Sequence, residues 1–263
     1  MKNSAENINI LGQFCGKRDI AELTQEQLQK KYGISQADVM VLFGGSILCG
    51  GDVLAEAMQN KVARKYVIVG GAGHTTEALR KRMHQEYPAM ETDGLPEAQV
   101  FAGYLKYRYG LEADLLECES TNCGNNITYL LEVLKEKGIS FRSIILSQDA
   151  TMQHRMEAGL RKYVDDTVQI INYAVYSAKV VEKDNGLAYE KDIWGMWEID
   201  RYISLLMGEI PRLSDDENGY GPRGKDFITH VDIPDEVRKA FDELCEEYSD
   251  LVRVANPLYA SKK

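Results

Sequence analysis

The sequence lacks the marks of secreted and membrane proteins. It has five cysteines in 263 residues, an odd number spread along the chain, so a disulfide framework is not expected. No apolar run approaches the roughly eighteen residues of a membrane-spanning helix. The start of the chain, from Met1 to Asn7, lacks the hydrophobic region and cleavage site of a signal peptide. We therefore expect a cytoplasmic protein with no membrane partner.

Clustered positive charge and metal-binding patterns are also missing. The formal net charge is −10, and the densest basic stretch is only Arg80-Lys81-Arg82. Proteins that bind nucleic acids need several clustered cations to displace counterions from phosphates, so we expect no nucleic-acid partner. Cys118 and Cys123 lie close together, but no second pair of cysteines or histidines completes a zinc pattern. We expect no metal site.

Short apolar runs alternate with helical patterns through the middle of the chain. This alternation predicts an α/β fold, a Rossmann-like doubly wound sheet of mostly parallel strands. We expect residues 36–180 to form this domain, and residues 1–35 and 181–263 to form a smaller helical part. The expected strands are 39–43, 66–69, 115–118, 144–146 and 168–173. A helix is expected to begin near Thr24, because Thr24 and Gln27 have the spacing of a capping box. The other expected helices are 6–15, one through Leu54, Met58 and Val62, 77–87, 97–109, 126–137, 151–163 and 234–248, with a further apolar helical stripe through Ile193, Trp197, Tyr202 and Leu206.

Four of the strand-like runs end in small polar clusters. The carboxyl ends of parallel strands meet at one edge of a sheet, where α/β proteins bind ligands. The clusters therefore predict a site for a small polar ligand. The residues that we expect to contact the ligand are Gly44, Gly45, Gly70, Gly71, Gly73, His74, Asn122, Asn126, Gln148, Asp149, Thr151 and Arg155.

Residues 70–76 form the most ligand-like cluster. Glycine lets the backbone approach a ligand closely, and the following helix offers free N–H groups. The cluster is not a P-loop, and it lacks the third glycine of a dinucleotide fingerprint. It could instead be a strand–helix turn capped by Thr75 or Thr76. His74 could bind the ligand or transfer protons, or it could bond a neighbouring carbonyl.

The two later clusters have alternative explanations in helix capping. Asn125 or Asn126 could cap the helix after the third strand, although one cap leaves a surplus of polar side chains for a ligand. Cys123 could be a nucleophile, but a buried thiol is an alternative. Asp149 could be an N-cap, and Arg155 could either meet an anionic ligand group or face solvent.

A glycine-rich polar loop at 215–227 completes the set of candidate segments. It interleaves an aromatic residue and two cations with glycines, Asn218-Gly219-Tyr220-Gly221-Pro222-Arg223-Gly224-Lys225. We expect this loop to cover the ligand, with Tyr220 stacking a base and Arg223 meeting a carboxylate. The alternative is a flexible connection.

Six segments together carry a resemblance to a known family: Gly70-Gly71-Ala72-Gly73-His74-Thr75-Thr76, Glu97-Ala98, Ser120-Thr121-Asn122-Cys123-Gly124, Gln148-Asp149-Ala150-Thr151-Met152-Gln153, Gly208-Glu209-Ile210-Pro211-Arg212-Leu213 and Gly219-Tyr220-Gly221-Pro222-Arg223-Gly224. With them, the chain resembles the YdcF-type branch of the SanA/YdcF family (domain of unknown function 218) over about residues 7–237. The resemblance implies a Rossmann-like fold with a helical addition, S-adenosylmethionine as ligand, and Glu97 as a ligand contact or base. The chain departs from the wider family at Cys123, Asn125 and His154, which replace Thr, Glu and Arg.

The motifs and the resemblance are compatible with three functions. The first is a soluble protein that binds S-adenosylmethionine and uses it in an unidentified reaction, or binds it without catalysis. The second is a hydrolase or transferase for a phosphorylated or glycan-linked metabolite, with His74, Asp149 and Arg155 in acid–base and anion-stabilising roles. The third is a ligand sensor. Candidate catalytic residues are Glu97, His74 and Asp149, and the oligomeric state is not predicted.

Overall fold

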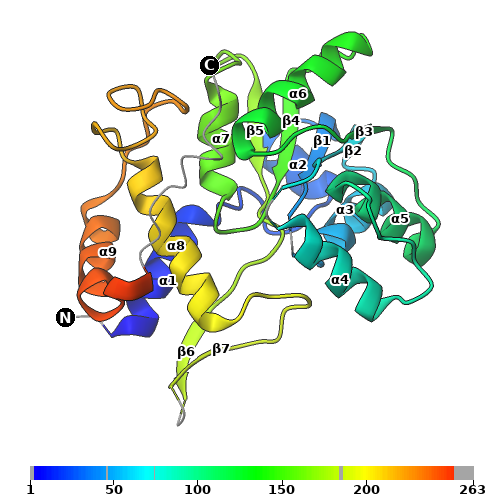
Figure 1. The fold of residues 1–263 in the computed structure, drawn as a ribbon. Coiled ribbons are helices and arrows are strands. Elements are labelled where there is room, and N and C mark those ends of the chain that lie inside the picture. Colours follow the sequence, from blue (N-terminus) through cyan, green and yellow to red (C-terminus); the bar gives the residue numbers. More distant parts are fainter. Residues whose placement is uncertain (1–2, 46, 74, 184–185, 252–263) are drawn as a thin grey trace.

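The structure, a computed structural model, describes residues 3–45, 47–73, 75–183 and 186–251. Its centre is a five-stranded sheet in which every strand pairs in parallel, in the order β3-β2-β1-β4-β5 (Figure 1). The predicted Rossmann-like α/β fold is confirmed. The strands are β1 (Ala37–Phe43), β2 (Ala63–Val69), β3 (Leu115–Glu117), β4 (Ser143–Ser147) and β5 (Gln169–Asn172).

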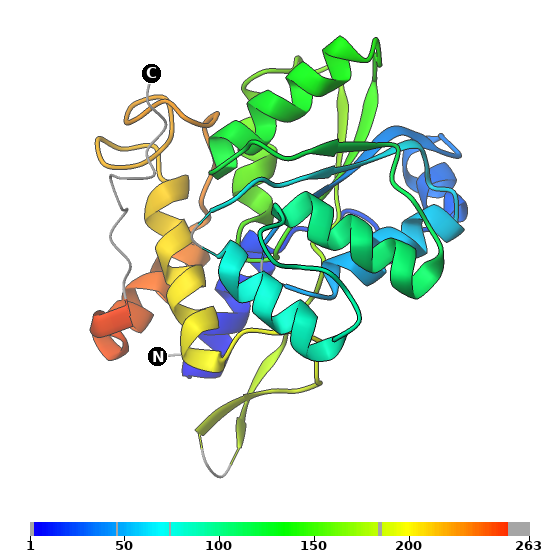
Figure 2. The ribbon, with the colours of Figure 1, turned by 45° about the vertical axis from the view of Figure 1, so that its right-hand side comes forward.

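Helices cover both faces of this sheet, because successive strand residues point to opposite sides and both sides are apolar. Val39 and Val41 pack with α6 and α7, whereas Met40 and Leu42 belong to the larger cluster with α3 and α5. Figure 2 shows the two layers. The helices of this region are α3 (Gly50–Gln59), α4 (Thr76–Glu86), α5 (Glu97–Tyr109), α6 (Cys123–Glu136) and α7 (Gln153–Arg161).

The ends of the described chain form a helical group beside α7. In this group α1 (Ser4–Cys15) contacts α8 (Ile199–Leu213) and α9 (Asp235–Glu247) (Figure 1). Leu11 and Met207 share one buried cluster with Met40 of the sheet, so the helical group and the sheet have a common core. The short helix α2 (Gln25–Tyr32) begins at Thr24, whose hydroxyl accepts the Gln27 N–H at 3.2 Å, as the capping pattern predicts.

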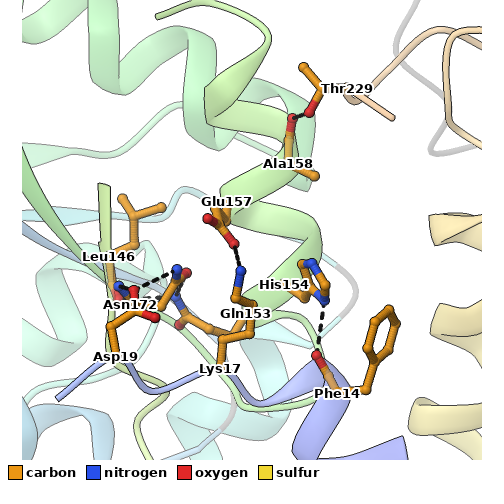
Figure 3. A network of polar contacts seen from close by, with 10 residues as sticks. All are labelled: Phe14, Lys17, Asp19, Leu146, Gln153, His154, Glu157, Ala158, Asn172 and Thr229. Atoms are coloured by element: carbon orange, nitrogen blue, oxygen red, sulfur yellow. Dashed lines mark hydrogen bonds and ion pairs between the residues drawn. The ribbon is translucent and has the colours of Figure 1, made fainter. Parts of the chain in front are cut away.

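A polar network holds the segment after α1 against α7 and β5 (Figure 3). The Asp19 carboxylate accepts the backbone N–H of Asn172 at 2.6 Å and its side-chain N–H at 3.0 Å. The His154 ring contacts the Phe14 carbonyl at 2.9 Å, and Lys17 pairs with Glu157. The N-terminal helix is therefore fixed to the sheet by contacts near the carboxyl ends of β4 and β5.

Two features of the second half of the chain differ from the predictions. The strands β6 (Val180–Lys183) and β7 (Gly186–Tyr189), which were not predicted, pair antiparallel, and the helix expected through Ile193 and Trp197 starts later. Ile193 and Trp197 precede α8, which starts at Ile199, and a short 3-10 turn spans Ser249–Leu251. Apolar and polar residues do not alternate along the partly buried strands β6 and β7, so the sequence pattern did not predict them. Among the described residues, no helix is both long and apolar enough to cross a bilayer.

Candidate functional site

The order of the strands reverses between β1 and β4, and the segments that follow these strands diverge there. Ligands of doubly wound sheets bind at this position. We use the name strand-end site for Glu97 and the segments 44–45, 70–73 and 148–151. Gly44 follows β1, Gly70 follows β2 and Gln148 follows β4. The Gln148 amide lies 3.4 Å from the Gly44 carbonyl oxygen, so the structure brings two of the predicted clusters together.

Glu97 is the acidic centre of the strand-end site. It is the first residue of α5. Its N–H donates to the Gly71 carbonyl oxygen at 2.9 Å, and the Ala98 N–H donates to the Gly70 carbonyl oxygen at 2.8 Å. These two bonds satisfy donors that a helix start leaves free, and they seat α5 on the segment after β2. Only 8% of the Glu97 surface is exposed.

The two carboxylate oxygens of Glu97 have different surroundings. Oε1 accepts the hydroxyls of Thr76 at 2.9 Å and Thr75 at 3.3 Å. Oε2 lies against glycine backbone, since a Cβ added at Gly44 would come within 2.6 Å of it and one at Gly70 within 3.3 Å. Glycine is therefore required at Gly44 by the close approach of Glu97, which explains a residue that the sequence pattern could only flag.

Burial and polar neighbours act in opposite directions on Glu97. Burial raises its pKa, and the hydroxyls of Thr76 and Thr75 and the charge of Arg80 oppose that rise, but the pKa remains above the usual value of a glutamate. A buried carboxylate with a raised pKa carries a free-energy cost, and such groups concentrate at functional sites.

The segment at 70–73 is tightly packed against the segment after β3. The Gly71 N–H donates to the Ser120 carbonyl oxygen at 3.1 Å. The same oxygen would lie only 2.3 Å from a Cβ at position 71. The Gly73 N–H donates to the Thr76 hydroxyl at 2.7 Å, and a Cβ at position 73 would meet only Thr121, at 3.4 Å. Thr75 occupies the N-cap position of α4 without a side-chain capping bond. His74 lies outside the described residues.

Asn122, not Asn125 or Asn126, is the N-cap of α6, which begins three residues earlier than predicted. Its Oδ1 accepts the Asn125 N–H at 3.0 Å, and its amide donates to the Asn125 side chain at 2.7 Å. The cap therefore engages two of the polar side chains that seemed surplus. Asn126 is half-buried in the first turn, with its N–H on the Asn122 carbonyl.

Asp149 is a buried structural junction. Its Oδ1 accepts the Thr151 N–H and hydroxyl, both at 2.9 Å, and the Tyr176 hydroxyl at 2.7 Å. Its Oδ2 accepts the Trp197 indole N–H at 2.7 Å. Asp149 is not the helix N-cap, because α7 begins at Gln153. These partners leave Asp149 and Thr151 engaged within the protein, and the Gln148 side chain is likewise bonded to the Asp149 N–H at 2.6 Å.

Arg155 is largely buried, so the alternative of a solvent-facing arginine is wrong. Its guanidinium forms two bonds to the Glu209 carboxylate of α8, at 2.5 and 2.9 Å, and both side chains are largely buried. Burial lowers the pKa of Arg155, but the nearby Cys123, Glu209 and Tyr220 raise it by more. Glu209 lay within one of the matching segments but was not predicted to pair with Arg155, 54 residues earlier in the chain.

The loop at 215–227 lies beside this buried pair. Tyr220 is within electrostatic range of Arg155, and its ring meets Phe227 edge-on at 5.2 Å. Arg223 is exposed and pairs with Asp215 of the same loop, at 3.5 Å. The loop therefore places Tyr220 near Arg155 of α7, whereas Arg223 is bonded within the loop.

Glu117, at the tip of β3, was not predicted: its Oε1 accepts the N–H groups of Glu119 and Ser120, and its buried Oε2 makes no hydrogen bond. In the described part of the chain, no group of three or more His, Cys, Asp or Glu side chains is placed to hold a metal ion. Open grooves of about 820 and 790 Å³ lie away from the strand-end site.

A comparison with models of known protein families finds no match.

Proposed function

We propose that the protein binds S-adenosylmethionine at the strand-end site. The observation that carries the proposal is Glu97, a buried carboxylate whose Oε2 faces the glycine backbone of Gly44 and Gly70 at the ends of β1 and β2. A glycine-lined edge lets a ligand approach the backbone, and a carboxylate can accept from an ammonium or a ribose hydroxyl. It also attracts a sulfonium cation. The resemblance to the YdcF-type branch supports the same ligand.

The ligand would lie beside Gly73, because the backbone at Gly71 is packed closely against Ser120. Gly73 leaves more room, because a Cβ there meets only Thr121 at 3.4 Å. Tyr220, near Arg155 of α7, is the aromatic side chain that we assign to stacking on the adenine. Glu97 would then contact the amino-acid end or the ribose.

A thermal melt with S-adenosylmethionine, S-adenosylhomocysteine, ATP and NAD tests this proposal. A ligand present at about a hundred times its dissociation constant adds roughly 2.7 kcal/mol to the free energy of unfolding. We expect stabilisation by the sulfonium compound and its demethylated product. Gly73→Val and Glu97→Ala variants should lose the shift, and the site assignment fails if they bind as tightly as the wild type.

The phosphoester hypothesis has less support from the described contacts. Asp149 and Arg155, two of its three candidate side chains, are engaged by Trp197 and Glu209. The third, His74, lies outside the described residues. A panel of phosphoesters is the next experiment if no compound in the melt stabilises the protein; turnover that His74→Ala abolishes would favour this second function.

A further inference from the structure

A polar groove lies at the end of the sheet where the strands begin, opposite the strand-end site. Its volume is about 790 Å³, within the range of about 300–1,000 Å³ typical of small-molecule sites. Three arginines from separate segments line it: Arg64 at the start of β2, Arg142 before β4 and Arg161 at the end of α7. The chain as a whole carries a formal net charge of −10, so a groove lined by three guanidinium groups differs from the rest of the chain in the sign of its charge.

Hydrogen bonds orient the guanidinium of one of these arginines and anchor the backbone of a second. Nη1 of Arg161 donates to the carbonyl oxygens of Asp165 at 2.8 Å and Val168 at 3.0 Å, which orients the guanidinium. The backbone N–H of Arg142 donates to Asp38 Oδ2 at 2.8 Å, so this residue is anchored while its side chain is exposed. The scaffold therefore orients the Arg161 guanidinium, and the Arg142 side chain extends into the groove region from a fixed backbone position.

The acidic side chains of the groove do not cancel this charge. Asp38 and Asp166 are its two carboxylates, against three arginines. The Oδ2 of Asp38 is occupied by the N–H groups of Arg142 and Ser143 and by the Ser143 hydroxyl, and its Oδ1 lies 3.4 Å from Arg64. Among the lining residues one excess positive charge remains, with the exposed guanidinium donors of Arg64 and Arg142; the carboxylate of Asp165, outside the lining, also interacts with Arg161.

We propose that this groove binds a small molecule that carries two or more phosphate groups. The planar guanidinium fork matches phosphate geometry and forms paired, charge-assisted bonds with it. Arginines from three segments can contact successive phosphates, which a single phosphate would not require. The groove is at the edge of the sheet opposite the strand-end site, so this binding is independent of S-adenosylmethionine.

Calorimetric titration with inorganic triphosphate tests the proposal. We expect binding to the wild type at low salt that weakens as salt screens the guanidinium charges. The variant Arg64→Gln/Arg142→Gln should bind about tenfold or more weakly, equivalent to about 1.4 kcal/mol. The control Arg108→Gln/Arg238→Gln removes the same charge from exposed residues of α5 and α9, and it should bind like the wild type.

Three results would overturn the proposal. The first is an absence of binding of triphosphate to the wild type. The second is equal weakening in both double variants, which would reflect net charge rather than the groove, and the third concerns a single variant. Because Arg64 pairs with Asp38, the single variant Arg142→Gln is tested as well. Its melting temperature should match that of the wild type, and it should still weaken triphosphate binding; unchanged affinity in this folded variant also contradicts the proposal.

Discussion

Gly44 and Gly45 are neighbours with very different tolerance for a side chain. A Cβ at Gly44 would lie 2.6 Å from Oε2 and 2.8 Å from Cβ of Glu97, whereas one at Gly45 would meet only Gln148, at 3.6 Å. Neither glycine has a positive φ, so the difference is one of space and not of backbone conformation. The packing of Glu97 is therefore what restricts position 44.

We predict that Gly44→Ala destabilises the protein by about 1–3 kcal/mol, the usual cost of overpacking. Gly45→Ala is the control and should change the free energy of unfolding by less than about 0.5 kcal/mol. Urea denaturation followed by circular dichroism measures both. Equal stability of the two variants would show that Glu97 does not press against Gly44.

A second prediction concerns the charge of Glu97. Burial raises its folded-state pKa, so ionisation costs stability as the pH rises through that pKa. Glu97→Gln removes this cost and keeps an oxygen for the Thr76 hydroxyl. The variant should melt at a higher temperature than the wild type near pH 8, and the difference should shrink as the pH approaches about 4.3, the ordinary value.

Melting curves of the two proteins across that pH range provide the measurement. A glutamate kept only for stability would give the reverse result, with Glu97→Gln less stable near neutral pH. A gain in stability combined with a loss of ligand binding is the usual signature of a functional residue.

Among the helices, α7 and α8 are joined by the buried pair of Arg155 and Glu209. Removing one member of a buried pair leaves the other charge without a partner, which typically costs about 3–5 kcal/mol. We predict this loss for Arg155→Met. The double variant Arg155→Met/Glu209→Met should recover much of it, because no charge then remains buried.

Chemical denaturation of the two variants and the wild type tests this coupling. A loss below about 1 kcal/mol for Arg155→Met would mean that Glu209 is well solvated without Arg155. Arg155 would then be available to a ligand, as the sequence had suggested.

The sequence predicted local features of the helices and strands better than contacts between them. All five sheet strands, the helix 97–109 and the cap at Thr24 follow from periodicity and capping patterns that lie within a few residues. The pairing of Arg155 with Glu209 joins positions 54 apart, and no local pattern specifies it. The antiparallel pair β6–β7 was missed because its partly buried strands have no clear alternation.

The same distinction applies to the candidate site. Parallel strands place their carboxyl ends at one edge, so the glycine clusters could be assigned to one site from the sequence. The partners of Asp149 could not, because Tyr176 and Trp197 lie beyond β5 and before α8 and reach it only in the folded chain. A side chain that looked available for catalysis is instead bonded within the protein.

In the molecule as a whole, Asp149 joins the end of β4 to the segment that leads into α8. We predict that Asp149→Ala leaves the Tyr176 and Trp197 donors buried without a partner and destabilises the protein by about 1–3 kcal/mol. Tryptophan fluorescence should also change, because Trp194 and Trp197 are the only tryptophans. Asp192→Ala, at an exposed position in that segment, is the control and should change neither property. Unchanged stability and fluorescence of Asp149→Ala would contradict this structural role.

The proposed ligand depends on one carboxylate at the edge of the sheet. Calorimetric titration of S-adenosylmethionine into the wild type and into Glu97→Gln, under conditions where both are folded, tests that dependence. We predict one binding site in the wild type and affinity at least about tenfold weaker in the variant. Equal affinity in the two proteins, or no binding to the wild type, would contradict the proposed role of Glu97.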